Sequence, residues 1–181
     1  MGDIHQPLHV GAAYYDQDCE NLVDPNVVGA GKPDFGIGTT VVATTGGNDF
    51  HIGSSKNLHA YWDDSAVIGA MRLKGITDKS AQNFAQAIVN APPRSWRTAG
   101  DVDAWSAQWA SEVLPIADQA IADAEIGEVT SHTESNAGLK CTWSATVDRN
   151  YSKWANQQAL TQLGKAGFRL AALLQAIFEK P

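Results

Sequence analysis

A histidine and an aspartate four residues apart have the types and spacing to do chemistry together. They are His59 and Asp63, in the stretch NLHAYWDD of residues 57–64. Residues at positions i and i+4 of a helix share one face, about one turn apart. An imidazole and a carboxylate so placed could hold one metal ion, form an ordinary hydrogen bond or do nothing. The pair alone does not decide among these three outcomes.

Other side chains of the same types surround this pair in the first third of the chain. They are His5, His9 and His51, with Asp3, Asp49 and Asp64. Mixed histidine and aspartate ligands without a nearby thiolate suit a catalytic zinc site, which uses three protein ligands and keeps one position open. His9, His59 and Asp63 would supply such a set. The alternative is a surface hydrogen bond between His59 and Asp63, with His5 and His9 in a polar loop.

The elements that must carry these residues are mostly helices. Pro7 forbids a continuous helix through the N-terminal segment, so a helix should end near Ile4 or His5. From Ser54 or Ser55 onward, apolar residues recur at helical spacing. Further helices are expected over residues 77–90, from residue 101 or 103 to about 124, and from residue 148 or 150 through the last apolar stripe.

A long glycine-rich stretch, residues 11–53, lies between the segments that carry His9 and His59. Within it, the β-branched residues 39–45 predict a short strand, and GGND at 46–49 would turn into a partner strand at 50–52. Residues 126–148 mix polar and β-branched types and predict a loop with some hairpin character. The sequence therefore predicts a mainly α fold with a long irregular insertion and a short hairpin.

Composition bounds the size, the charge and the redox state of the protein. A chain of 181 residues with 44% hydrophobic residues favours one domain, residues 1–181, with a real core. The net charge of −7 argues against tight electrostatic binding of duplex DNA. No apolar run is long enough to span a membrane. Cys19 and Cys141 could pair in an oxidising compartment, or both be free thiols.

Three motifs in order resemble one known family. They are GDIHQPLHVG, then TTGGND, then NLHAYWD, and the tail LGKAGFRLAALLQAIF is similar to the last helix of the same family. The resemblance is to the S1/P1 nucleases, zinc-dependent single-strand nucleases and 3′-nucleotidases. Their fold is a helical bundle similar to that of bacterial phospholipase C. The match covers essentially all 181 residues.

The resemblance implies specific roles for the candidate ligands. Family members bind three zinc ions, and the aspartate of the first motif, here Asp3, bridges two of them. The second histidine of that motif, His9, binds the remaining ion together with His59 and Asp63. Asp3 and Asp63 are therefore the expected catalytic carboxylates.

Three neighbouring polar residues receive lesser roles from the same resemblance. His5 is not a zinc ligand in the family and is expected to orient a neighbour by hydrogen bonding. Asn48 of TTGGND lies near the site in family members and is a candidate substrate-binding residue. Asp64 is expected to be solvated or to support a ligand.

The chain also departs from the family pattern. The family has a ligand histidine four residues before the aspartate that corresponds to Asp3, and further ligands upstream of it, at positions that would precede Met1. We therefore expect an N-terminally truncated domain, about the C-terminal two-thirds of a family member, with one complete zinc site and only a bridging ligand for the other two ions. A secreted or periplasmic parent protein is expected.

The leading functional hypothesis is a zinc-dependent phosphodiesterase that hydrolyses single-stranded DNA or RNA and 3′-nucleotides by metal-activated water. One alternative is a non-catalytic remnant that binds a single zinc ion through His9, His59 and Asp63. Another is a hydrolase of the same architecture that acts on phospholipid head groups, as phospholipase C does. Nucleic acid or nucleotides are the expected partners, with no membrane and no protein partner.

Overall fold

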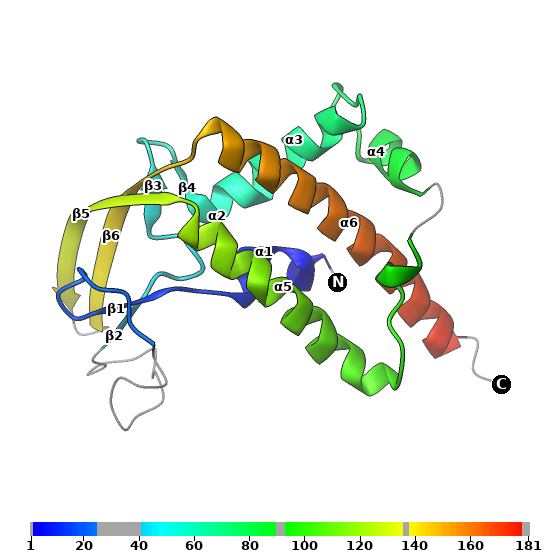
Figure 1. Cartoon of the computed structure of the whole chain (residues 1–181), viewed down its shortest axis with the longest axis horizontal. Coiled ribbons are helices and arrows are strands. Elements are labelled where there is room, and N and C mark those ends of the chain that lie inside the picture. The colour runs from blue at the N-terminus through cyan, green and yellow to red at the C-terminus, as the bar shows by residue number, and fades with distance from the viewer. Residues whose placement is uncertain (1, 25–40, 90–92, 136–137, 179–181) are drawn as a thin grey trace.

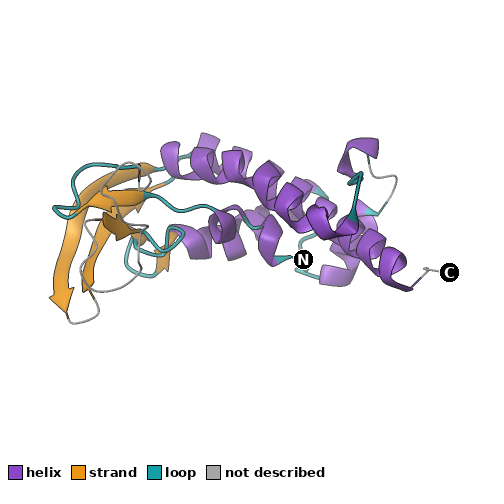
Figure 2. Ribbon diagram, turned by 90° about the horizontal axis from the view of Figure 1, so that it is seen from below, coloured by secondary structure: helices purple, strands orange, loops and turns teal. Residues whose placement is uncertain are grey.

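The fold is a bundle of helices with a β-sheet at one end, as the computed structural model shows for residues 2–24, 41–89, 93–135 and 138–178 (Figure 1). Figure 2 shows the strands gathered at one end and the helices running away from them. The predicted mainly α class is confirmed. Much of the predicted irregular insertion, residues 25–40, lies outside the described residues.

The N-terminal segment forms two short helical turns. A 3₁₀ helix, Asp3–His5, is followed by α1, Pro7–Val10, whose first residue is the proline. Proline is favoured at the first position of a helix, because its missing N–H is not needed there. Pro7 thus ends one turn, as predicted, and also begins the next. Both turns pack against α5, Trp105–Ala122, in the middle of the bundle (Figure 1).

The helical run after the insertion changes its winding partway. It consists of α2, Leu58–Ala60, a π-helical turn, Tyr61–Ser65, and α3, Ala66–Leu73. The side chain of Asn57 accepts a hydrogen bond from Ala60 N–H, so the helix begins a few residues later than predicted. Single π turns inside helices are frequent at functional sites.

The remaining helices build the long axis of the bundle. α6, Arg149–Phe178, begins after Asp148, whose carboxylate accepts from Tyr151 N–H, and it packs along α3. α4 begins later than the predicted residue 77, because Ser80 caps it: the Ser80 hydroxyl accepts from Asn83 N–H. The remaining bounds are α4, Ala81–Ile88, and the 3₁₀ turns Arg94–Trp96 and Val102–Ala104; α5 runs through Pro115 without ending.

The strands form two sheets. The smaller pairs β1, Tyr14–Asp16, with β2, Val41–Ala43. The larger has the order β4-β3-β6-β5, with β3 Phe50–Ile52, β4 Lys56–Asn57, β5 Glu125–Ser135 and β6 Gly138–Thr146.

Two sequence-based predictions about strands were wrong in their pairing or extent. The strand predicted within residues 39–45 exists as β2, but it pairs with β1, while β3 pairs with β4 and lies parallel to β6. The stretch 126–148 is mostly the long hairpin β5–β6 rather than a loop. Phe50 of β3 is fully buried and packs edge-on against Trp143 of β6, with ring centroids 5.5 Å apart.

A disulfide bond between Cys19 and Cys141 joins the segment after β1 to strand β6. Both cysteines are buried, and the indole of Trp143 donates a hydrogen bond to the Cys19 carbonyl over 3.0 Å. Tyr15 packs against the same indole at a centroid distance of 4.5 Å. The sequence left open whether the two cysteines pair or are free thiols, and in the structure they pair.

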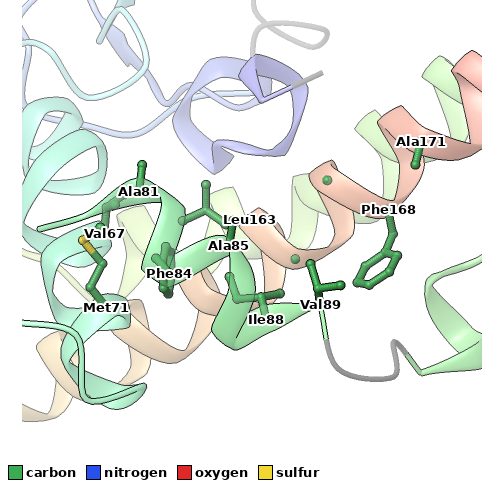
Figure 3. Close-up of a pocket in the computed structure, with 12 residues that line it drawn as sticks. Val67, Met71, Ala81, Phe84, Ala85, Ile88, Val89, Leu163, Phe168 and Ala171 are labelled. Carbon is green, nitrogen blue, oxygen red and sulfur yellow. The ribbon is translucent and has the colours of Figure 1, made fainter.

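An apolar hollow of about 550 Å³ lies where α4 meets α3 and α6. Figure 3 shows Met71, Phe84, Ile88 and Phe168 among the side chains that line it. The outer face of α6 also exposes apolar side chains, among them Leu170 and Leu174. Nevertheless, among the described residues no helix is long and apolar enough to cross a membrane.

Candidate metal centre

His59 is held by a backbone carbonyl group from a neighbouring turn. The histidine lies in α2, two residues after the helix cap Asn57, and its Nδ1 is 2.9 Å from the Gly46 carbonyl oxygen. A carbonyl oxygen can only accept, so Nδ1 carries the hydrogen and Nε2 presents a lone pair. Such a hydrogen bond is the usual device that orients a metal-binding histidine.

The turn that carries Gly46 is fixed by a buried carboxylate. Asp49 is 4% exposed, and its two oxygens accept from Thr45 Oγ1 at 2.5 Å and from Lys140 Nζ at 3.2 Å. Gly46 has φ +60°, and a Cβ atom there would clash with the Leu8 carbonyl oxygen. The turn therefore lies directly against α1 and brings α1 close to His59.

His9 meets His59 through the Nε2 edges of the two rings. The ring planes are within 19° of parallel, the ring centroids are 4.8 Å apart, and the Nε2 atoms are 3.0 Å apart. His9 Nδ1 is 2.7 Å from Asp3 Oδ1, which as a carboxylate oxygen accepts its hydrogen. Both Nε2 atoms would thus direct lone pairs at each other, which is repulsive unless a cation, a proton or a metal ion, lies between them.

Asp63 adds a carboxylate to this pair of nitrogens. Its Oδ2 lies 3.5 Å from His59 Nε2, and its Oδ1 lies 3.9 Å from His9 Nε2. Asp63 is in the π-helical turn, next to Trp62, which is buried and donates a hydrogen bond to Tyr151. The turn therefore directs Trp62 into the core and Asp63 to the surface.

The three side chains fit a zinc ion. Ligand atoms of His9, His59 and Asp63 all lie within 4.8 Å of one another. Donors bound to one zinc ion at about 2.0–2.2 Å lie roughly 3–4 Å apart, so the observed separations need little adjustment. Two imidazole nitrogens and one carboxylate are the donor set of a catalytic zinc site with an open position. These are the residues that the sequence singled out for one complete site.

Asp3 contacts His9 and does not face the space between the three ligand atoms. Its carboxylate contacts His9 Nδ1, on the side of the ring away from His59, and its side chain is 84% exposed. A carboxylate that accepts from a ligating histidine raises the basicity of the other ring nitrogen. The position is also open to solvent, so a further ion could reach Asp3. Its predicted role as a bridging ligand stays a prediction.

Asn48 and Asp64 both have partners within the protein. Asn48 donates to the Thr45 carbonyl at 2.8 Å and accepts from Asn57 at 3.3 Å, so it ties the turn to the cap of α2. Asp64 forms an ion pair with Lys56 at 2.5 Å, and this hydrogen bond lowers the pKa of the exposed carboxyl. Asp64 therefore binds Lys56 rather than joining the ligand cluster.

His5 anchors the N-terminal segment inside the bundle. It is buried, and its Nε2 lies 3.0 Å from the guanidinium of Arg169 on α6. Arg169 is also buried and pairs with Glu112 of α5 at 2.5 Å. Burial alone would raise the pKa of Glu112, but hydrogen bonds from Arg169 and Lys165 outweigh it and lower that pKa. The segment from Asp3 to His9 is thus attached to both α5 and α6.

A second group of side chains of metal-binding type lies in and near the larger sheet, but its cysteines cannot bind a metal ion. Cys19, His132 and Cys141 have ligand atoms within the same distance limit. The two cysteines form the disulfide, so they offer no thiolate to a metal. Of the groups found among the described residues, the cluster of His9, His59 and Asp63 is the one suited to an ion.

Two supporting groups of the site were not found from the sequence. They are the Gly46 carbonyl and the side chain of Gln6, which donates to Asp63 Oδ1 at 3.0 Å. The pair Gly46-Gly47 predicts a tight turn, but it does not predict that the Gly46 carbonyl contacts the His59 ring. Proline at the first position of α1 was a usable signal, since it makes the preceding Gln6 the helix cap.

Replacing Gly46 with alanine should disrupt the site through the backbone. The change should lower the free energy of unfolding by about 3 kcal/mol, because it combines an unfavourable positive φ with a clash against α1. Zinc affinity, measured by competition with a chelating dye, should fall as well. Gly53→Ala is the matched control: it has φ +63° and nothing within 4 Å, so it should cost only about 1 kcal/mol. Equal effects of the two substitutions would contradict this account.

Comparison with known proteins assigns the chain to a family. A model of the S1/P1 nuclease family matches residues 1–179. No curated protein and no solved structure gives a significant match. The matched residues include every ligand candidate described above, and the family is one of nucleases, which hydrolyse phosphoester bonds. The chain belongs to the S1/P1 nuclease family.

Proposed function

We propose that this protein is a zinc-dependent phosphodiesterase that hydrolyses single-stranded DNA or RNA and 3′-nucleotides. The observation that carries the proposal is the 3.0 Å approach of the Nε2 atoms of His9 and His59, with the Asp63 carboxylate beside them. Both imidazoles have their other nitrogen hydrogen-bonded, to Asp3 and to Gly46, so their Nε2 lone pairs are available to a metal.

The chain contributes ligands, orientation and access. A zinc ion bound there would polarise a phosphoryl oxygen and lower the pKa of a coordinated water. The side chains of His9 and His59 are 27% and 18% exposed, so the ring nitrogens lie near the surface within reach of a phosphate group. Asp63, 48% exposed, would hold the ion from the open side. The carboxylate of Asp3 would hold the proton on His9 Nδ1 and offer a ligand to a further ion.

The acidic charge of the protein suits a nucleic-acid substrate only if bound metal ions supply positive charge at the site. The net charge of −7 repels phosphate, so the positive field must come from bound ions. Asn48 is proposed to contact substrate, since it lies two residues from the carbonyl that holds His59 and is partly exposed. The buried disulfide supports a secreted or periplasmic location, because such bonds persist in oxidising compartments.

Metal removal tests the proposed activity. Purified protein should cleave single-stranded DNA and release phosphate from a 3′-nucleotide. Chelation should reduce both activities at least about 100-fold, and added zinc should restore them, because the metal supplies the main stabilisation of charge. The ratio of zinc to protein, measured by elemental analysis, separates the alternatives. One zinc ion per chain without cleavage would favour a non-catalytic binder, and chelator-resistant cleavage would overturn the proposal. Cleavage of lecithin but not of nucleic acid would favour the phospholipase alternative.

A further inference from the structure

Gln6 contacts both helix α1 and the metal centre. It precedes Pro7 as the cap of α1, and its Oε1 accepts from Leu8 N–H at 2.5 Å. An N–H donor fixes the orientation of the amide, because it can bond only to the oxygen. The Nε2 of Gln6 must therefore face the other way, where it donates to Asp63 Oδ1 at 3.0 Å.

We propose that Gln6 is the positioning residue that sets the orientation of Asp63 for zinc. The inference deepens the proposed function and rests on it. With Oδ1 hydrogen-bonded to Gln6, the oxygen turned toward His59 Nε2 is Oδ2. The bond joins residues 57 positions apart in the sequence, so it also ties the start of α1 to the π-helical turn.

The need for such a bond follows from the exposure of Asp63. A carboxylate on a half-exposed side chain is free to rotate in solvent unless another group holds it. His9 and His59 have their orientation set by Asp3 and Gly46, and Gln6 supplies the corresponding partner of the third ligand. Outer partners of this kind typically contribute 10- to 100-fold to metal affinity, so losing this one should cost roughly that much.

The test replaces Gln6 with serine. Serine caps helices well but is too short to reach Asp63, so the variant keeps the cap and removes the amide donor. Zinc affinity, from competition with a chelating dye, should fall about 10- to 100-fold. The visible absorption of bound Co²⁺ should change as well, because it reports ligand geometry. The matched control is Gln119→Ser, which removes an exposed glutamine-to-aspartate bond of the same length, 3.0 Å, to Asp123. It should leave both readouts unchanged.

A double-mutant cycle separates positioning of Asp63 from support of α1. In an Asp63→Ala background, where His9 and His59 should still bind zinc weakly, Gln6→Ser should cause no further loss. The same fold-loss in both backgrounds would overturn the inference, because Gln6 would then act through the helix. Unchanged affinity in Gln6→Ser alone would overturn it too. If the unmodified protein bound no zinc, the proposed function itself would fail, and that result needs no variant.

Discussion

Replacing His59 with alanine should lower the zinc affinity of the protein by about 100- to 1,000-fold. A four-ligand zinc site binds with an apparent free energy of roughly 10–16 kcal/mol, or about 2.5–4 kcal/mol per ligand. His59 is the residue through which the other groups meet: its Nε2 faces His9, its Nδ1 contacts Gly46, and it lies 3.5 Å from Asp63. Nuclease activity should fall in parallel.

The matched control for this substitution is His51→Ala. His51 is an exposed histidine of β3, and its side chain is not part of the ligand cluster. Zinc titration of both variants, with circular dichroism to verify folding, measures the difference. If His59→Ala and His51→Ala bound zinc equally well, the cluster would not be a metal site, whatever the activity of the protein.

Removing the disulfide should cost about 4–5 kcal/mol of the free energy of unfolding. The bond closes a loop with a sequence separation of 122, and the entropy lost by the unfolded chain grows with the logarithm of that length. Cys19 and Cys141 are both buried, so substitution with alanine places no polar group in the core. For a domain of this size the midpoint of thermal unfolding should fall by roughly 8–20 °C.

Chemical denaturation of the Cys19→Ala, Cys141→Ala double variant measures this loss. Chemically reduced wild-type protein is the control, because reduction breaks the same disulfide bond and leaves both cysteine side chains in place. Zinc affinity of the folded double variant should stay within about threefold of the original, because the cysteines lie outside the ligand cluster. A loss of stability below about 1 kcal/mol in both samples would show that the unfolded chain is already restricted by other means.

The helices were largely predictable, because their apolar periodicity is local. The last helix follows from spacing and capping chemistry, which left its cap at Asp148 or Asn150, and the structure has Asp148. The pairing of the strands was not predictable in this way. The β-branched residues of β2 predict a strand but not its partner. That β2 pairs with β1 and not with β3 depends on contacts between distant segments. The parallel pairing of β3 with β6 depends on contacts between residues about ninety positions apart.

The candidate site was predictable in its ligand types and not in its supports. The spacing of His59 and Asp63 placed them on one face, and the structure brings their ligand atoms within 3.5 Å. Nothing in the sequence signalled the π-helical turn between them, since no residue type specifies that winding. The partners of His9 and Asp63, Asp3 and Gln6, become visible only when the chain has turned at Pro7.

The ligands also come from segments that only the folded chain holds together, at positions 9, 59 and 63. An unfolded chain offers no such cluster, so zinc would bind the native state alone and shift the folding equilibrium toward it. At a free zinc concentration 100 times Kd, this linkage is worth about 2.7 kcal/mol. Under the proposed function, the survival of the protein against proteases would therefore follow the zinc content of its surroundings.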